Sequence, residues 1–320
     1  MCSPFAHGYQ RILSLAVALT ALAGFASGTL AQDKLAEPIY RVANDTPAAQ
    51  SAATTQTTAP AGTNAAAGVA QAAVAAAAGA AGFDLTQKPG EHPLMPVLRT
   101  LKTTQEEIDH NVRDYSCTLV KQERVNGELG ESQHIMMKVM NQPFSVYMSF
   151  LKPFAGREVL YVAGQNDGKL MVQETGFTRM LGKISLDPNG TRAMTGQRHP
   201  ITDVGMRNLT AKLLKMWDAE TKFAEAEVTS NSDPKIKVAG RSPTMIQVVH
   251  PIPRQDFKFH VARLFIDNEL KVPIHFDAYL WPEQAGGEPT LEESYTYTNL
   301  KINNGFTARD FDAANPEIFK

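Results

Sequence analysis

After residue 114 the sequence repeats one pattern: a segment rich in β-branched, aromatic and methionine side chains is followed by a short turn. These segments span residues 115–125, 132–140, 144–151 and 159–164. Parallel strands need long crossover connections, whereas turns this short join antiparallel neighbours. The Asn126-Gly127 dipeptide is the strongest of the turn signals, since both residues tolerate the positive φ of a type I′ hairpin. The chain therefore has to build an antiparallel meander.

Amphipathic segments and further strand-like segments complete the pattern. Apolar residues recur at helical spacing over residues 94–112 and 201–220, which predicts a helix in each, the second with Thr202 or Asp203 as its N-cap. Further strands are predicted over residues 169–174, 183–186, 245–249, 257–267, 273–281 and 291–302. This order of elements predicts an α+β fold that is mostly β.

The N-terminus predicts export. Arg11 precedes an apolar run over residues 12–23, and small residues follow up to Ala31. This order is typical of a secretory signal peptide, which we place at residues 1–31. The run is short for a bilayer core of about 30 Å, so we expect no transmembrane segment after cleavage, and a protein in the periplasm or outside the cell. An uncleaved signal would instead anchor the chain at its N-terminus.

A tether is predicted between the signal peptide and the folded domain. Residues 46–82 consist mainly of Ala, Thr, Gln, Pro and Gly, contain no charged residue, and have almost no large apolar side chains with which to dock. Such a composition cannot offset the entropy of ordering the chain. We assign residues 32–92 to a disordered Ala/Thr/Pro-rich tether and residues 93–320 to a single β-rich domain, which is long enough to bury a core of its own.

Charge and cysteine content exclude several classes of protein. The 31 Lys and Arg residues nearly balance the 33 Asp and Glu residues, so no nucleic-acid partner is expected, although the balance is compatible with a local basic patch. Cys2 leaves with the signal peptide, which makes Cys117 the only cysteine of the exported chain and rules out an internal disulfide. No Cys or His spacing is typical of a metal site, and we expect no cofactor.

Catalytic signals are sparse. The sequence has no nucleophile elbow, no His-Glu-x-x-His helix and no phosphate-binding loop. Cys117 and His134 lie on neighbouring predicted strands and are the best candidates for the nucleophile and base of a hydrolase. A buried cysteine explains the same apolar pattern and is preferred. The adjacent acids Glu292 and Glu293 are predicted to lie on a solvated face. We therefore expect a protein that is not an enzyme.

Several predicted strands carry large apolar side chains on both faces, as Ile135, Met136 and Met137 do in succession. Both faces of the sheet would then be covered, by a core or by an apolar guest, to which methionine side chains adapt well. Strand parity selects these candidate ligand-binding residues: Met136, Met148, Phe150, Arg157, Tyr161 and Trp217. Arg157 would hold an anionic head group or, alternatively, form a surface ion pair with a neighbouring acid.

Four motifs resemble an uncharacterised family of exported bacterial proteins, and the resemblance covers about residues 94–320. They are Tyr-Ser-Cys-Thr at 115–118, Asn-Gln-Pro-Phe at 141–144, Pro-Phe-Ala-Gly-Arg-Glu-Val-Leu-Tyr at 153–161 and Asp-Phe-Asp-Ala-Ala-Asn-Pro at 310–316. More distantly, the order of elements is similar to that of the lipoprotein carriers LolA and LolB and the sensor RseB. That resemblance implies a half-open antiparallel barrel, with helices covering its concave face and a cavity for acyl chains.

The resemblance and the two-faced strands together predict a non-enzymatic binding domain for a lipid, an acyl chain or another apolar ligand, with a lipoprotein acyl chain among the expected partners. In the carriers a Lys- or Arg-Pro turn precedes the strand equivalent to residues 144–151, and here Asn141-Gln142-Pro143 stands in its place. The resemblance therefore implies the fold rather than lipoprotein carriage. The alternative is an envelope protein-interaction or sensing module, similar to RseB, whose cavity is filled by its own helices.

Overall fold

A computed structural model describes residues 83–284 and 286–320. The predicted signal peptide (residues 1–31) and the predicted tether up to residue 82 lie outside the described residues. The last part of that tether, residues 83–92, is not separate from the domain. Phe83 and Leu85 pack against the apolar core, and the Lys271 ammonium lies 4.8 Å from the centre of the Phe83 ring. The packed unit therefore includes Phe83, ahead of the boundary predicted at residue 93.

Of the α-helices in the described residues, one precedes the first strand, and two lie in the long connection between the seventh and eighth strands. The α-helices are α1 (Met95–Asn111), α2 (Thr191–Met194) and α3 (Met206–Glu220). Shorter 3-10 helices are η1 (Asn166–Gly168), η2 (Gly176–Leu181), η3 (Ile201–Asp203) and η4 (Ala308–Phe311). The helix predicted over residues 94–112 is confirmed as α1, and α3 forms the main part of the second predicted helix.

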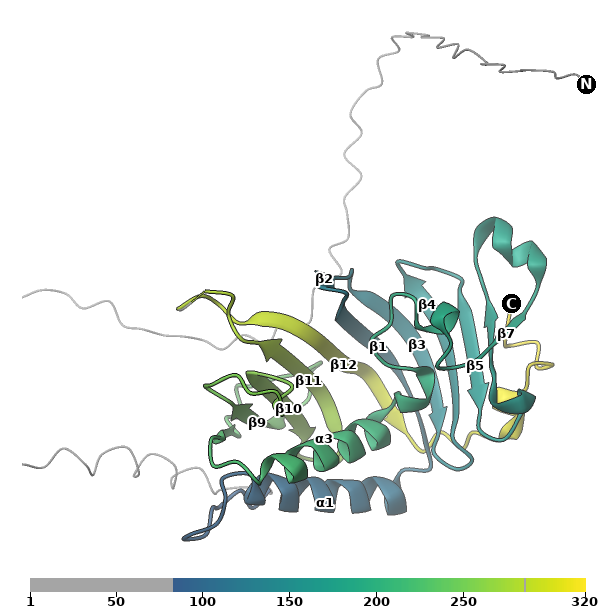
Figure 1. The fold of residues 1–320 in the computed structure, drawn as a ribbon. Coiled ribbons are helices and arrows are strands. Elements are labelled where there is room, and N and C mark those ends of the chain that lie inside the picture. Colours follow the sequence, from purple (N-terminus) through teal and green to yellow (C-terminus); the bar gives the residue numbers. More distant parts are fainter. Residues whose placement is uncertain (1–82, 285) are drawn as a thin grey trace, which may run out of the picture. The chain divides into compact units, whose positions relative to one another are not determined.

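One antiparallel sheet of 12 strands dominates the described part of the chain (Figure 1). Its strands are β1 (Asp114–Val125), β2 (Glu128–Leu129), β3 (Gln133–Met140), β4 (Ser145–Lys152), β5 (Glu158–Val162), β6 (Leu170–Gln173), β7 (Ile184–Leu186), β8 (Glu227–Asn231), β9 (Pro243–Val249), β10 (Val261–Asp267), β11 (Pro273–Leu280) and β12 (Thr290–Ile302). They are arranged in the order β7-β6-β5-β4-β3-β1-β12-β11-β10-β9-β8, with β2 added beside β1. The predicted fold class, mostly β, is confirmed.

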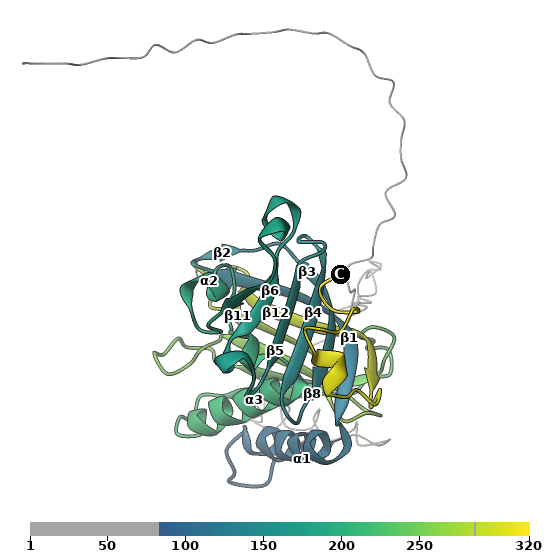
Figure 2. The same ribbon diagram turned by 90° about the vertical axis from the view of Figure 1, so that its right-hand side faces the viewer.

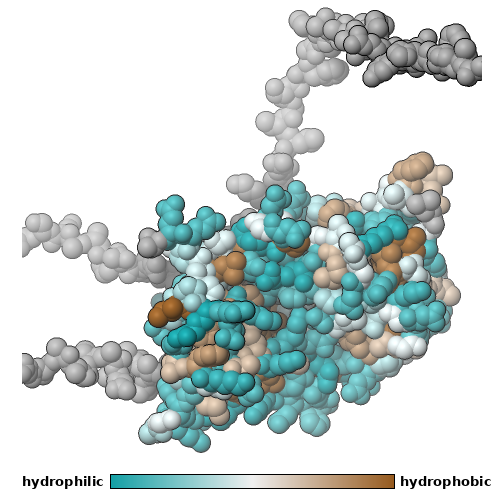
Figure 3. Space-filling view, viewed as in Figure 1, coloured by the Kyte–Doolittle hydropathy of each residue, from teal (hydrophilic) through white to brown (hydrophobic). Residues whose placement is uncertain are grey.

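The sheet is open rather than closed into a barrel, because β7 and β8 are edge strands and no pairing among the described residues joins them. Its centre is the pairing of β1 with β12, in which Leu119 lies opposite Tyr297. The two ends of the domain thus meet in the middle of the sheet. On the face shown in Figure 3 most of the surface is hydrophilic, and hydrophobic side chains gather at the upper right, over the loop that contains η2.

The predicted hairpin at Asn126-Gly127 is confirmed. Asn126 has a φ of 53° and Gly127 a φ of 84°, as a turn with two left-handed residues requires. The short strand β2 that follows this turn was not predicted, and neither was β8. Both are rich in polar residues and largely exposed, so they lack the apolar alternation by which strands are recognised.

The helices α1 and α3 lie side by side and cover the part of the sheet formed by β9, β10 and β11 (Figures 1 and 2). Trp217 of α3 is fully buried there, in contact with a dense apolar cluster. Its other buried members are Leu94, Val97, Leu98, Leu101, Leu213, Ala226, Ile246, Val248, Phe259, Ala262, Leu264, Ile266, Phe276 and Ala278. The apolar stripes that predicted the two helices are therefore the stripes that bind them to the sheet.

The N-terminus of α3 differs from the prediction. Thr202 and Asp203, predicted as N-caps, lie in η3, and the N-cap of α3 is Gly205, with a φ of 106°. A Cβ atom at Gly205 would lie 2.8 Å from the Tyr115 hydroxyl oxygen, so only glycine fits both the conformation and the space. That hydroxyl instead accepts a hydrogen bond of 3.1 Å from the backbone N–H of Met206. A side chain from β1 thus replaces the local cap, which sequence spacing could not show.

The C-terminal residues 303–320 pack on the other face of the sheet, where η4 lies against β4 and β5 (Figure 2). Phe311 and Ile318 form an apolar cluster with Tyr147, Leu160 and Val162. The buried Glu158 carboxylate accepts hydrogen bonds of 2.5 Å from the Tyr147 hydroxyl and from the Phe319 backbone N–H. The C-terminal motif noted in the sequence therefore closes this face of the sheet.

Candidate functional site

A cavity of about 820 Å³ lies between the sheet and the segment that leads from β7 through α2 and η3 into α3. This volume falls within the range of about 300–1,000 Å³ typical of small-molecule sites. The strands β1, β3, β4, β5, β6 and β12 contribute its floor, and residues 186–205 together with α3 contribute its cover. The helices that fill the space over β9–β11 do not fill it over β3–β6.

The floor of the cavity is apolar. Alternation along each strand brings one side chain in two to this face, and those side chains are almost all aliphatic or aromatic. The apolar floor residues are Leu119, Ile135, Met148, Phe150, Val159, Leu170, Val172 and Tyr297. Cover residues including Leu186, Ala193, Ile201 and Leu209 continue this surface on the other side. An apolar group inside the cavity would contact carbon atoms on several sides.

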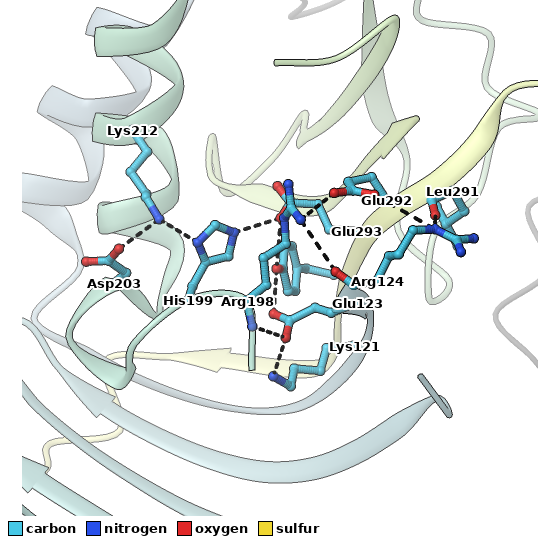
Figure 4. Close-up of polar contacts among 11 residues, drawn as sticks. Lys121, Glu123, Arg124, Arg198, His199, Asp203, Lys212, Leu291, Glu292 and Glu293 are labelled. Carbon is cyan, nitrogen blue, oxygen red and sulfur yellow. Dashed lines mark hydrogen bonds and ion pairs between the residues drawn. The ribbon is translucent and has the colours of Figure 1, made fainter. Parts of the chain in front are cut away.

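Charged residues meet at the edge of this apolar floor, in a group that we call the clamp: Lys121 and Glu123 of β1, Glu293 of β12, and Arg198 and His199 from the segment before η3 (Figure 4). Lys121 Nζ lies 3.1 Å from Glu123 Oε2, which also accepts a 3.0 Å hydrogen bond from the Arg198 backbone N–H. Arg198 Nε lies 2.9 Å from Glu293 Oε2. The clamp therefore joins the cover of the cavity to the centre of the sheet.

Burial and charge act against each other on Glu123. Burial raises the pKa of this carboxyl, but the Lys121 ammonium and hydrogen bonds from Tyr295 and Arg198 more than offset it, so the pKa lies below its usual range. Tyr295 responds in the opposite way: burial, followed by the charges of Glu293 and Glu123, raises the pKa of its hydroxyl far above the usual value. Its hydroxyl donates to Glu123 Oε1 at 2.7 Å. Glu123 is thus held in its charged form.

His199 links the clamp to α3. Lys212 Nζ donates to His199 Nδ1 at 3.1 Å and lies 2.8 Å from Asp203 Oδ2. Because an ammonium can only donate, Nδ1 must accept, and the ring proton lies on Nε2, which donates to Glu293 Oε2 at 2.7 Å. The imidazole therefore bridges the helix and the sheet with one defined tautomer.

A buried acid and a buried histidine lie together where the cavity approaches the region under α3. Glu220 lines the cavity, and its Oε2 lies 3.4 Å from Nε2 of His250; both side chains are buried. Nδ1 of His250 faces the carbonyl oxygen of Phe259 at 3.2 Å and must donate to it, which leaves Nε2 as an acceptor. Burial raises the pKa of Glu220 to about 7 and lowers that of His250. Glu220 Oε2 and His250 Nε2 lie close together, but neither atom has a hydrogen-bond partner among the described residues.

The sequence-predicted site residues fall into two groups. Met148, Phe150 and Arg157 line the cavity. Arg157 forms an ion pair with Glu174, with Nε and Oε2 2.8 Å apart, and its guanidinium lies 4.2 Å from the centre of the Phe154 ring. Arg157 therefore forms the ion pair with an acid that was the alternative to holding a head group. Binding of a ligand by Met148, Phe150 and Arg157 stays a prediction.

Met136, Tyr161 and Trp217 do not line the cavity. Met136 packs into the C-terminal cluster on the opposite face, because it is Met137, its neighbour, that lies opposite Met148. The parity assigned to Met136 was therefore wrong by one residue. Tyr161 contacts Phe144, with ring centres 6.1 Å apart, and Trp217 is buried between α3 and the sheet.

The hydrolase hypothesis loses its best candidates. Cys117 lies opposite Met137, whereas His134 lies opposite Val120, three positions along the strand. An odd offset places Cys117 and His134 on opposite faces of the sheet. Burial raises the pKa of the Cys117 thiol far above its usual range, which leaves it without thiolate character. The cysteine is a buried apolar residue, as the preferred interpretation of the sequence held.

The clamp was missed by sequence reasoning. Glu292 and Glu293, predicted on a solvated face, are buried and pair with Arg198. The sequence did hold a signal for these buried charges: Lys121 and Glu123 follow Leu119 at every second position of β1, so all three side chains face the cavity. Charged residues at buried strand positions need partners, and these come from a segment about 75 residues away. That distance is why only the fold could identify them.

Two further findings apply to the part of the chain that the structure describes. No helix in residues 83–284 or 286–320 combines the length and the apolar character needed to cross a bilayer. The same residues contain no group of three or more His, Cys, Asp or Glu side chains placed to hold a metal ion.

Several solved structures are similar to this chain at low sequence identity. The Mycobacterium tuberculosis lipoprotein LppX has a TM-score of 0.38 at 14% identity, over 68% of this chain and 100% of that chain. MucB in the Pseudomonas aeruginosa MucA/MucB complex has a TM-score of 0.38 at 15% identity, over 68% of this chain and 61% of that chain. A LolA superfamily protein from Nitrosomonas europaea has a TM-score of 0.26 at 8% identity, over 67% of this chain and 97% of that chain. Likenesses this distant carry no argument about activity.

No curated protein matches this sequence. The family model described as "Protein of unknown function (DUF1571)" matches residues 112–318, which include every strand from β1 to β12 and the whole of the cavity lining. The chain belongs to the DUF1571 family.

Proposed function

We propose that this protein is a non-enzymatic binding domain that holds one amphiphilic molecule, a lipid or an acyl-chain compound, in the cavity between β3–β6 and the segment covering them. The observation that carries the proposal is the cavity of about 820 Å³ with an apolar floor. An apolar guest there would remove both its own surface and that of the lining from water, at about 25 cal/mol per Å² of apolar surface buried.

The polar part of the ligand is expected at the edge of the floor. Three further cations line the cavity and have no ion-pair partner among the described residues: Arg192 and Lys215 on the cover, and Lys258 before β10. The clamp residues are already neutralised in pairs, so an added anion would meet these three exposed cations first. A ligand with an apolar chain and an anionic head group matches both surfaces.

Binding of a fluorescent fatty acid to protein stripped of lipid tests the proposal, and mass spectrometry of an organic extract would identify a native ligand. Ala193 lines the cavity from its covering segment, so Ala193→Trp should fill the cavity without deleting a core side chain. We expect this variant to lose about tenfold or more in affinity for the probe, because part of the buried ligand surface is displaced.

Ala211→Trp is the matched control, since Ala211 is exposed on α3 and does not line the cavity. It should bind the probe as the unaltered protein does. Equal binding by the unaltered protein and the Ala193→Trp variant, or an extract without lipid and no uptake of the probe, would rule the proposal out.

The alternative, an envelope protein-interaction module with a self-filled cavity, is less well supported. It requires the helices to fill the concave face, whereas about 820 Å³ is left open over β3–β6. Export of the protein rests on the N-terminal apolar run and belongs to the proposal, as do a periplasmic or extracellular location and an uncleaved signal acting as an anchor.

A further inference from the structure

Two loops lie next to each other at one end of the strands β4, β5 and β6, beside the cavity. The last two residues of β4 and the β4–β5 turn, residues 151–157, precede β5, and the β6–β7 loop, residues 174–183, follows β6. The first residue of β5, Glu158, pairs with the last residue of β6, Gln173, so the two loops begin side by side. A Cβ atom on Gly156 would lie 3.6 Å from the Thr175 methyl group, and this contact joins them further out. We call these two loops the tip.

The tip exposes large apolar side chains. Phe177 is 83% exposed and Met180 is 80% exposed, on the same 3-10 helix η2 (Figure 1). Leu151 and Phe154 on the neighbouring turn are exposed by 52% and 38%. Of the six large apolar side chains that the described residues leave exposed, four lie on the tip. In Figure 3 this is the hydrophobic area at the upper right. Clustered exposure of this kind marks a binding surface more often than a single exposed residue does.

Cations surround these apolar side chains. The tip carries Lys152, Arg157, Arg179 and Lys183 against one acid, Glu174, which gives it a net charge of +3 on a chain with a formal net charge of −2. Arg157 is neutralised by Glu174, while Lys152 and Arg179 form no ion pair among the described residues. Apolar side chains projecting between unpaired cations suit a surface that is apolar inside and anionic outside.

We infer that the tip is a docking surface for a phospholipid bilayer, with Phe177 and Met180 entering the acyl boundary and Lys152 and Arg179 contacting anionic head groups. A folded protein partner would instead need shape complementarity over a broad area, which two narrow loops do not offer. This inference goes beyond the proposed function, since docking does not require a ligand in the cavity.

The tip also adjoins the cavity. Phe150 lines the cavity floor, and its ring contacts that of Phe154 on the tip, with ring centres 6.3 Å apart and nearly perpendicular planes. Arg157 contributes to both, because it lines the cavity and stacks on Phe154. A bilayer docked at the tip would therefore lie at the end of the cavity formed by β4, β5 and β6.

Vesicle binding tests the inference, with the chain purified after export and every variant prepared in the same way. The vesicles are phosphatidylcholine with a minor share of phosphatidylglycerol, and bound protein is measured by sedimentation. Phe177→Ser combined with Met180→Ser should weaken binding by about tenfold for each side chain, because each loses its burial in the acyl boundary. Lys152→Gln combined with Arg179→Gln should weaken it by about fivefold for each charge and reduce its dependence on salt.

Ile252→Ser is the matched control, because Ile252 is 58% exposed but lies on the loop between β9 and β10. It should leave vesicle binding unchanged. Depth of insertion is read from Phe177→Trp, whose added fluorescence should shift to the blue on vesicles and be quenched by brominated lipid, whereas that of Ile252→Trp should not.

Vesicle binding that is absent in the unaltered protein, or that survives unchanged in Phe177→Ser with Met180→Ser, would overturn the inference. Loss of a dimer rather than of vesicle binding in that double variant would also overturn it and assign the tip to a second copy of the chain.

Discussion

The two halves of the sheet are covered in different ways. Over β9–β11 the helices α1 and α3 are packed directly on the strands, and Trp217 is completely buried between them. Over β3–β6 the cover is residues 186–205, which include the short helix α2, together with one side of α3, and a cavity of about 820 Å³ lies beneath it. The same strand chemistry faces inward in both halves. What differs is how closely the cover packs: α1 and α3 lie directly on β9–β11, the filled half, whereas over β3–β6, the hollow half, residues 186–205 and one side of α3 leave open the space that the proposed ligand would fill.

The filled half should respond most strongly to truncation. Trp217→Ala is expected to lower the free energy of unfolding by about 3–5 kcal/mol, since it leaves a cavity that close-packed neighbours cannot fill. Urea denaturation followed by circular dichroism measures this. Lys215→Ala, two residues away and exposed, should stay within about 0.5 kcal/mol of the unaltered protein. A loss below about 1 kcal/mol for Trp217→Ala would mean that this half is loosely packed too.

Two methionines allow packed and cavity-lining positions to be compared within the hollow half. Met137 and Met148 lie opposite each other on β3 and β4, but only Met148 lines the cavity. Met137→Ala should cost about 2–5 kcal/mol of unfolding free energy. Met148→Ala should cost about 1 kcal/mol, because part of that side chain already faces open space and has fewer contacts to lose. Urea denaturation of the two variants measures both losses of unfolding free energy. Equal losses for Met137→Ala and Met148→Ala would show that the cavity is closed by packing in solution.

A pH-dependent effect is expected at Glu220 and His250, where the cavity approaches the region under α3. The pKa of Glu220 is raised from 4.5 to about 7, so the fold binds this proton more tightly than the unfolded chain does. That contribution to stability is fully present below pH 4.5 and is lost as the pH rises towards about 7. Glu220→Gln keeps a neutral hydrogen-bonding side chain, so it should make the protein more stable at pH 8 by roughly 1–3 kcal/mol.

At pH 4 the Glu220→Gln variant should match the unaltered protein, because Glu220 is then protonated in both the folded and the unfolded chain. Glu227→Gln, at an exposed position on β8, should leave the pH dependence unchanged. An unaltered slope of stability between pH 5 and pH 7 in Glu220→Gln would show that Glu220 is charged in the folded protein.

Local sequence signals determined most of the elements. Asn126-Gly127 specified its hairpin through backbone conformation alone, and the spacing of Leu94, Leu98 and Leu101 specified α1. These predictions succeeded because the physical cause lies within a few residues of the effect. The start of α3 failed for the converse reason, since its cap is the hydroxyl of Tyr115, 91 residues earlier in the chain.

The site was only partly predictable. Met148, Phe150 and Arg157 line the cavity, whereas Met136 lies on the other face, because a strand with apolar residues on both faces does not reveal which face is inward. The acids of the clamp looked solvated, since Glu293 has no basic neighbour in sequence and finds Arg198 only across the fold.

The sequence by itself therefore determined the antiparallel meander, the amphipathic helices and the buried nature of Cys117, because each depends on local periodicity or composition. Only the tertiary structure decided that β1 pairs with β12, that the C-terminal residues close one face, and that the other face is left hollow over β3–β6. These features depend on where distant segments come to lie against each other, and periodicity along the chain carries no information about that.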